Sequence, residues 1–258
     1  MPTALITGAS TGIGRELAYL CAEDGYDVVL TARSEAQLAV LAADIQQKTG
    51  RSAWVFAKDL SDTAAPRQLF DDIRCTDITV DVLINNAGFG FVGRFWELDE
   101  KEQMQMVRLN VDALTHLSRL FLPGLIKRGH GGILNVASTA AFQPGPLMSV
   151  YYATKAYVVS FSEALYNEAR EHGVTVTCLC PGPTKTEFDK RAGLSGTKLV
   201  ESGRVMSARS VAEIGWKALK AGKPLVIAGR LNALLAFFTR FAPIQFTASM
   251  ARRFQESK

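Results

Sequence analysis

Short apolar runs alternate along this 258-residue chain with longer stretches in which apolar residues recur every three or four positions. The short runs predict β-strands and the periodic stretches predict α-helices. The expected strands cover residues 3–7, 27–31, 52–57, 80–85, 132–137, 174–180 and 224–228. Helices fill the gaps between them, and the two longest are expected near 98–128 and 150–172.

This alternation of strand and helix is typical of a parallel sheet that helices cover on both faces. We therefore predict an α/β fold, a doubly wound and mostly seven-stranded parallel sheet in a single domain. Side chains that follow the carboxyl ends of neighbouring strands gather at one edge of such a sheet. Open α/β sheets bind their ligands at that edge.

Composition narrows the class of protein. Hydrophobic residues make up 48% and charged residues 21% of the chain, which are ordinary values for a globular domain. The formal net charge of +4 is modest, and the sequence has no long run of Lys or Arg. We therefore expect no nucleic acid among the partners.

Cysteine and histidine usage argues against two further classes. The four cysteines, at positions 21, 75, 178 and 180, do not form the dense pattern of a disulfide scaffold. The three histidines lack metal-ligand spacing. The sequence reaches its first strand without a basic and apolar leader, so no signal peptide is visible. We expect a cytoplasmic protein with reduced thiols and no catalytic metal.

A glycine-rich turn joins the first predicted strand to the first predicted helix. Gly8, Gly12 and Gly14 have the spacing G-x-x-x-G-x-G in TGASTGIG. Glycines let a backbone approach a pyrophosphate closely, and a helix start presents free N–H groups and a positive dipole end to it. Such a turn alone is often a plain connector, but its place between a strand and a helix favours a dinucleotide site.

The second predicted strand ends at Ala32 and Arg33. An NAD site of this type has an acidic residue there to hold the ribose 2′-hydroxyl, and Ala32 cannot do so. The Arg33 guanidinium is suited to a phosphate instead. The pattern predicts NADPH rather than NADH, and a surface arginine without a ligand is the alternative interpretation.

Tyr151 and Lys155 lie four residues apart in VYYATKAY, and Ser138 lies thirteen residues before Tyr151. One helical turn places the phenol beside the ammonium, which lowers the phenol pKa from its usual value of about 10. Such a phenol can pass a proton to or from a carbonyl oxygen, and Ser138 can hydrogen-bond the same oxygen. The three residues predict the interconversion of a carbonyl and an alcohol.

Several motifs together resemble the short-chain dehydrogenase/reductase family. In the order of that family, they are TGASTGIG, Asp59–Leu60, INNAG at 84–88, RLNV around Asn110, Ser138, YYATK and CPGPTKT. The resemblance implies a Rossmann-type dinucleotide-binding and catalytic domain over residues 1–230.

The resemblance also implies roles for the matched residues. The catalytic residues would be Ser138, Tyr151, Lys155 and Asn110, with Tyr151 as the acid or base and Asn110 holding a water of a proton relay. The cofactor would be NADP(H), and the residues implied to bind it are Gly8, Ser10, Thr11, Gly12, Ile13, Gly14, Arg33, Asp59, Leu60, Asn86, Ala87, Gly88, Tyr151, Lys155, Pro181, Gly182, Thr184 and Thr186. Asn85 is expected to be structural.

Residues 183–207 are polar and contain glycine, which predicts a substrate lid. Its basic residues are candidates to meet a phosphate-bearing substrate handle, such as coenzyme A or an acyl-carrier arm; they are Lys185, Lys190, Arg191, Lys198 and Arg204. A solvated loop is the alternative. The candidates for an apolar pocket wall, with ordinary core as their alternative, are Phe89, Phe91, Phe142, Leu147 and Met148.

Residues 231–258 predict a hydrophobic helical extension, in which Leu231, Leu234, Leu235, Phe238 and Phe241 have helical spacing. The apolar run is shorter than the ~20 residues that a membrane span needs. Three roles stay open for this tail. It can cap the substrate pocket, pack between subunits, or make a peripheral membrane contact through 231–254.

These features predict an NADPH-dependent oxidoreductase that reduces an apolar ketone, aldehyde or 3-oxoacyl compound to an alcohol, or catalyses the reverse reaction. By resemblance, lipid-like substrates are expected. A non-catalytic NADP(H)-binding scaffold or redox-sensing protein is the alternative, because a fold does not guarantee its usual chemistry. The resemblance also implies a homo-oligomer, either a dimer or a tetramer.

Overall fold

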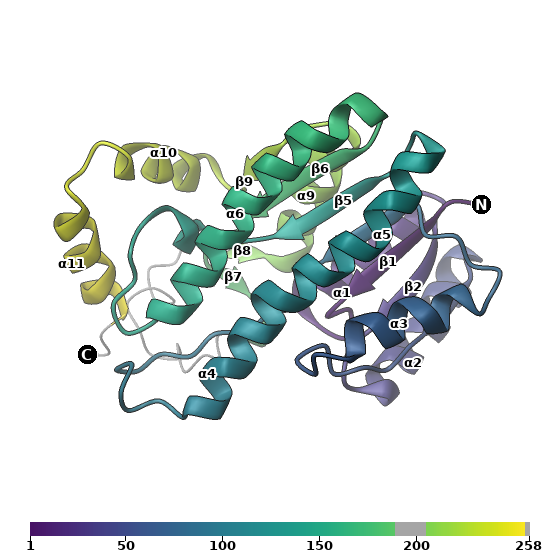
Figure 1. The fold of residues 1–258 in the computed structure, drawn as a ribbon, viewed down its shortest axis with the longest axis horizontal. Helices are drawn as coiled ribbons and strands as arrows, with labels where there is room; N and C mark the ends of the chain where they lie inside the picture. Colours follow the sequence, from purple (N-terminus) through teal and green to yellow (C-terminus); the bar gives the residue numbers. More distant parts are fainter. Residues whose placement is uncertain (189–204, 256–258) are drawn as a thin grey trace.

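The computed structural model describes residues 1–188 and 205–255, which build a seven-stranded parallel sheet between two layers of helices (Figure 1). The strands are β1 (Thr3–Thr7), β2 (Asp27–Thr31), β3 (Ala53–Val55), β4 (Val82–Asn85), β5 (Gly132–Val136), β6 (Thr175–Cys180) and β9 (Leu225–Ile227). Their order is β3-β2-β1-β4-β5-β6-β9, and each neighbouring pair is parallel. The predicted doubly wound α/β sheet is therefore confirmed.

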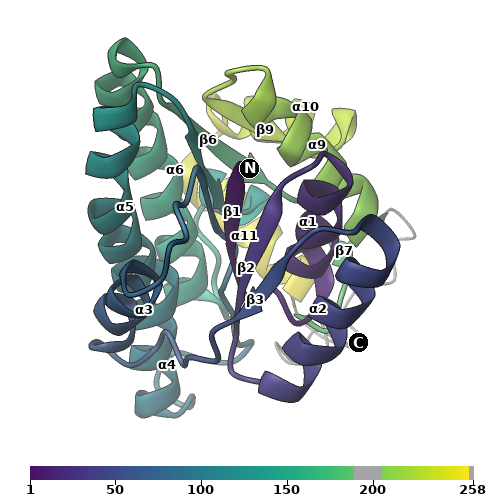
Figure 2. The ribbon, with the colours of Figure 1, turned by 90° about the vertical axis from the view of Figure 1, so that its right-hand side faces the viewer.

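The two helical layers lie on opposite faces of the sheet (Figure 2). One layer contains α1 (Gly12–Glu23), α2 (Glu35–Thr49) and α9 (Ala208–Lys220), and the other contains α3 (Ala65–Arg74), α5 (Leu114–Arg128) and α6 (Ser149–Ala169). Strand β1 shows why its sequence is apolar throughout. Ala4 and Ile6 pack in one core, while Leu5 packs in the core on the opposite face.

The long helix predicted near 98–128 has three parts. They are α4 (Glu100–Val107), a π-helical turn (Arg108–Ala113) and α5. Apolar periodicity did not predict the π-helical turn, because the buried residues Met106, Asn110, Ala113 and Leu117 keep the three- and four-residue spacing of an α-helix across it. The second long helix, predicted near 150–172, corresponds to α6 and a short 3₁₀ turn over Arg170–His172.

The ends of the predicted lid are held together by a short ladder. Thr184 and Lys185 form β7, which pairs in parallel with Met206 and Ser207 in β8. Four basic residues of the lid, Lys190, Arg191, Lys198 and Arg204, lie outside the described residues. The proposed contact between the lid and a phosphate-bearing handle therefore stays a prediction.

Two helices follow the last strand, α10 (Arg230–Thr239) and α11 (Ile244–Gln255). They lie beyond the carboxyl ends of the central strands, at the far end of the molecule from the N-terminus (Figure 1). Among residues 1–188 and 205–255, no helix has the length and apolar character that a membrane crossing requires. The division into a domain of 1–230 and an extension of 231–258 stays a prediction.

Candidate active site

A cavity of about 1480 Å³ opens at the carboxyl ends of β1, β2, β4, β5 and β6. Most of the predicted site residues line it, although they come from segments far apart in the sequence. They are Gly8, Ser10, Thr11, Gly12, Ile13, Arg33, Asp59, Leu60, Asn86, Ala87, Gly88, Ser138, Tyr151, Lys155, Pro181, Gly182, Thr184 and Thr186. Gly14 and Asn110 are the predicted residues that do not line the cavity.

The turn between β1 and α1 requires its glycines. Gly8 and Gly12 adopt φ angles of 65° and 57°, in the left-handed region that side chains with a Cβ rarely occupy. Gly14 does not line the cavity, and its predicted contact with a cofactor stays a prediction. A Cβ at Gly14 would lie 2.3 Å from the Gly8 carbonyl oxygen, so this glycine lets α1 begin directly behind the turn.

Two consecutive asparagines at the end of β4 make different hydrogen bonds. The Asn86 amide donates to the carbonyl oxygens of Thr7 at 2.9 Å and Gly8 at 3.2 Å, which fixes β4 against the glycine turn. The buried Asn85 amide instead donates to Asn135 at 2.9 Å and Ser118 at 3.1 Å, away from the cavity. Asn85 thus has the structural position that the sequence led us to expect.

The cradle fits a phosphorylated dinucleotide. Backbone N–H groups at the start of α1 and two left-handed glycines suit a pyrophosphate. Arg33 lines the same cavity beside Ser34 and Gln37, where its guanidinium can donate hydrogen bonds to an additional phosphate. Lys58 also lines this end and is paired with Asp72 at 2.7 Å.

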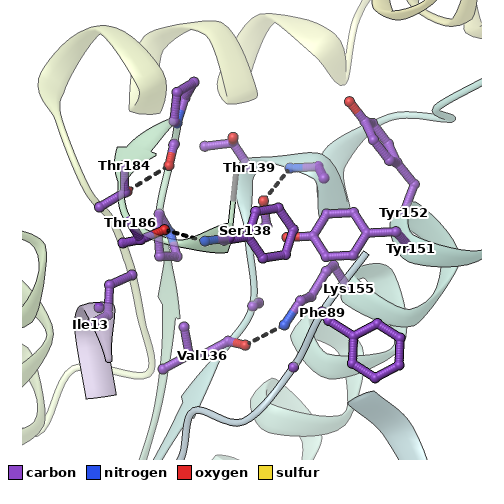
Figure 3. Close-up of a pocket in the computed structure, with 18 of the residues that line it drawn as sticks. Ile13, Phe89, Val136, Ser138, Thr139, Tyr151, Tyr152, Lys155, Thr184 and Thr186 are labelled. Atoms are coloured by element: carbon purple, nitrogen blue, oxygen red, sulfur yellow. Dashed lines mark hydrogen bonds between the residues drawn. The ribbon is translucent and has the colours of Figure 1, made fainter. Parts of the chain in front are cut away.

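Ser138, Tyr151 and Lys155 line one part of the cavity (Figure 3). Tyr151 and Lys155 lie one turn apart on α6, with the Lys155 Nζ 5.8 Å from the centroid of the Tyr151 ring. Ser138 follows β5, and its Oγ accepts the Ala140 N–H at 3.1 Å. Because that contact uses Ser138 as an acceptor, its hydroxyl hydrogen can be donated to a carbonyl oxygen.

The Lys155 side chain is 5% exposed, and its Nζ donates to the Val136 carbonyl oxygen at 2.9 Å (Figure 3). Burial lowers the pKa of this ammonium to about 8. A buried cation gains from any anion that comes beside it, such as a phenolate. The site therefore holds an amine that is ready to support negative charge on Tyr151.

Asn110 lies in the π-helical turn, behind the wall of the cavity. Its amide exchanges two hydrogen bonds with the backbone of Phe89, at 3.1 and 3.0 Å, and donates to Thr154 at 3.1 Å. A Cβ at Gly88 would lie 3.0 Å from Asn110 Oδ1 and 3.4 Å from Lys155 Nζ. Asn110 and Lys155 thus flank one small space, and the role of Asn110 in a proton relay stays a prediction.

The apolar wall has both expected and unexpected members. Of the predicted residues, Phe89, Phe142 and Met148 line the cavity, whereas Phe91 and Leu147 do not. Phe188 was not predicted, and its ring centroid lies 5.4 Å from that of Tyr151. The wall is therefore apolar directly beside the phenol.

Helices α10 and α11 complete this wall. From α10 the large apolar residues that line the cavity are Leu231, Leu235 and Phe238, and from α11 they are Phe246, Met250 and Phe254. The sequence contained a signal for the second set, because Phe246, Met250 and Phe254 recur every four residues. Of the three roles left open for the tail, the structure shows the cap over the pocket.

Comparisons with known proteins agree with this geometry. The family model described as short chain dehydrogenase matches residues 2–195. A very-long-chain 3-oxoacyl-CoA reductase of Laccaria bicolor is 40% identical over 177 residues, 67% of this chain and 52% of the relative. In a similar enzyme of Phaeosphaeria nodorum, the match covers 53% of the relative. The chain therefore spans about half the length of these curated relatives.

Solved structures match more completely. A short-chain dehydrogenase from Sphingobium yanoikuyae in complex with NADPH has a TM-score of 0.82 and 32% identity, with 93% of this chain and 95% of the other covered. A bulky-bulky ketone specific alcohol dehydrogenase from Comamonas testosteroni has a TM-score of 0.79 and 28% identity, with 93% of both chains covered. With its matched family model, its sheet and its shared cavity of motifs, this chain belongs to the short-chain dehydrogenase family.

Proposed function

We propose that the protein is an NADPH-dependent oxidoreductase that reduces an apolar ketone, aldehyde or 3-oxoacyl compound to an alcohol, or catalyses the reverse oxidation. The observation that carries this proposal is the meeting of Ser138, Tyr151 and Lys155 in the cavity that also contains the glycine cradle. Proton transfer and dinucleotide binding are thereby brought together in one continuous space.

The proposed cofactor site uses residues that follow β1 and β2 and a residue of α6. Gly8, Gly12 and the start of α1 hold the pyrophosphate, Arg33 holds the 2′-phosphate, and Lys155 holds the nicotinamide ribose. The complex of the Sphingobium yanoikuyae relative with NADPH supports this choice. When bound, NADPH supplies the hydride that the carbonyl carbon accepts.

The side chains of the protein stabilise and protonate the oxygen of the carbonyl group. Ser138 donates a hydrogen bond to that oxygen, which stabilises the negative charge that develops on it. Tyr151 transfers its hydroxyl proton to the same oxygen, so the product is an alcohol and the residue becomes a phenolate. The Lys155 ammonium stabilises the phenolate until a proton from solvent restores the phenol.

The proposed substrate is apolar because the wall beside Tyr151 is apolar. Phe89, Met148 and Phe188 contribute to it from the sheet side, and α10 and α11 contribute from above. A cavity of about 1480 Å³ has room for a long acyl chain or a bulky ketone in addition to a dinucleotide. The relatives named for very-long-chain 3-oxoacyl-CoA and for bulky ketones support this class, and with it a role in lipid metabolism.

The test is a panel of ketones, aldehydes and 3-oxoacyl thioesters of graded chain length, followed by the loss of NADPH absorbance. Tyr151→Phe should lower kcat by about 10²–10⁴ because the proton donor is removed, while NADPH binding stays unchanged. Tyr166→Phe is the matched control, since Tyr166 on α6 is followed by Arg170 at the same spacing but does not line the cavity.

Each outcome distinguishes the proposal from the non-catalytic scaffold. Turnover that depends on Tyr151 supports the reductase. Tight NADPH binding without turnover of any compound favours the scaffold or redox-sensing alternative. Near-normal turnover by Tyr151→Phe contradicts the assigned acid. The predicted homo-oligomer and the cytoplasmic location also stay proposals, and light scattering tests the first of them.

A further inference from the structure

Helix α10 has two apolar faces, and only one of them lines the cavity. Leu231, Leu235 and Phe238 contribute to the cavity wall. Leu234, Phe237 and Phe241 do not line it and are 52%, 53% and 73% exposed. Leu234 and Phe237 are three positions apart and share one side of α10, and Phe241 follows in the turn after Thr239 with its ring against that of Phe237, so the three form a continuous stripe. We call this stripe, together with the 64% exposed Ile244 at the start of α11, the outer face.

The outer face has no covering element among the described residues. The Phe237 and Phe241 rings touch one another with centroids 5.2 Å apart, which gathers the apolar surface into one patch. A soluble helix normally presents polar side chains on the face that points away from the core. A contiguous exposed apolar patch instead indicates an interaction surface.

The charge around the outer face indicates what covers it. No acidic residue stands between Arg230 and Gln255, whereas this segment contains four arginines at 230, 240, 252 and 253. Arg240 and Arg253 are exposed, and Arg240 lies between Phe237 and Phe241 in the sequence. Exposed aromatic residues bordered by arginines match the boundary of an anionic bilayer, where apolar groups enter the acyl region and cations meet phosphates.

We propose that the outer face of α10 and the start of α11 dock this protein on the surface of an anionic phospholipid bilayer. The ten residues of α10 make a helix of about 15 Å, so it lies along the surface and does not cross it. A second copy of the chain fits less well. A twofold contact through this face would bring arginines against arginines, with no carboxylate in the segment to pair with them.

The docking position also places the cavity beside the lipid. Leu235, Phe238 and Phe246 line the cavity and yet are 57%, 57% and 60% exposed, so they form its rim next to the outer face. An apolar molecule can then pass from the acyl region to the cavity without crossing water. This consequence rests on the proposed function, whereas docking itself does not.

Vesicle sedimentation of the full chain tests docking without any need for activity. The expected result is binding to vesicles of phosphatidylcholine mixed with phosphatidylserine, and weaker binding to phosphatidylcholine alone or at high salt. The double substitution Phe237→Ser and Phe241→Ser should lower the affinity for anionic vesicles on the order of tenfold or more, because apolar burial is lost. Arg240→Gln with Arg253→Gln should weaken binding to anionic vesicles only.

Val40→Ser is the matched control, since Val40 is 72% exposed on α2, which lies at the opposite end of the molecule from α10 (Figure 1). It should bind vesicles like the wild type. All variants should retain the wild-type circular dichroism and the reduction rate of a small water-soluble ketone.

Two results overturn the proposal. One is wild-type protein that stays unbound with both vesicle types, and the other is a double variant that binds as the wild type does. If the double variant instead turns a dimer into a monomer while vesicle binding is unaffected, the outer face is a subunit interface and the proposal is wrong.

Discussion

The Gln255 side-chain amide donates a hydrogen bond of 2.6 Å to the Tyr152 hydroxyl, which ties the last turn of α11 to the helix that carries Tyr151. Gln255 is 2% exposed, and burial raises the pKa of the Tyr152 hydroxyl. The two residues are 103 positions apart in the chain. This contact therefore holds the apolar cap against the sheet side of the cavity.

Removal of that contact should loosen the cap. Tyr152→Phe leaves the buried amide of Gln255 without its acceptor, and we expect the free energy of unfolding to fall by about 1–2 kcal/mol in urea denaturation. Limited proteolysis should cut the tail faster than in the wild type. Tyr157→Phe is the control on the same helix, because the Tyr157 hydroxyl pairs with Thr115 at an exposed position. Equal losses in the two variants would contradict the role of the contact.

Cofactor preference should depend on Arg33. Arg33→Ala removes a guanidinium from the cavity, so we expect the KM for NADPH to rise about 10–100-fold while the KM for NADH changes little. Arg74→Ala provides the comparison, since Arg74 is an exposed arginine of α3 that does not line the cavity. Stopped-flow or steady-state kinetics with both nucleotides make the measurement. An equal effect of Arg33→Ala on NADPH and NADH would refute the assignment of the 2′-phosphate.

The buried Lys155 predicts a pH dependence of stability. Burial lowers its pKa from the ordinary 10.5 to about 8. Between these values the unfolded chain binds the proton and the folded protein does not, so stability rises with pH in this window. Relative to Lys155→Met, the free energy of unfolding of the cofactor-free wild type should increase from pH 8 to pH 10.5, by an amount on the order of 3 kcal/mol. Parallel pH curves for the two proteins would show that the amine is not desolvated.

Two helical glycines should respond oppositely to alanine. In Gly14→Ala the new Cβ meets the Gly8 carbonyl oxygen at 2.3 Å, which should cost about 1–3 kcal/mol and weaken dinucleotide binding. In Gly124→Ala the nearest atom is Arg128 Nη1 at 3.3 Å, the end of a side chain, so after a shift of a few tenths of an ångström the helix should gain up to about 1 kcal/mol. Thermal unfolding with and without NADPH separates the two. If Gly14→Ala left thermal stability and NADPH binding unchanged, the turn would be able to shift and make room for the methyl group.

The sequence supported the sheet and most of the cavity residues because both depend on local patterns. Apolar runs marked the seven strands, and the order of motifs at their ends brought Gly8, Asn86 and Ser138 to one edge. The π-helical turn at Asn110 left no such trace, since its burial pattern resembles that of an α-helix. The close approach of Gly14 to the Gly8 carbonyl was not predicted, because a glycine that faces a ligand and one that faces a backbone atom look the same in sequence.

The sequence predicted that the cap is helical, but it did not predict which side of α10 lines the cavity. Leu231, Leu234 and Leu235 have equivalent hydrophobicity, and only the packing of α10 decides that Leu234 points outward. Phe188 was missed for a related reason. Its contact with Tyr151 joins residues 37 positions apart, and no periodicity of the sequence relates Phe188 to the helix that carries Tyr151. Long-range packing of this kind follows from the tertiary structure alone.

The position of α10 and α11 after the last strand has a consequence for divergence within the family. These helices contribute no strand to the sheet and none of the side chains proposed for proton transfer. Mutations can therefore accumulate in residues 230–255 and alter which molecules are accepted, while the hydride and proton chemistry is inherited unchanged. Exchange of its final two helices would give an ancestral reductase a different substrate range.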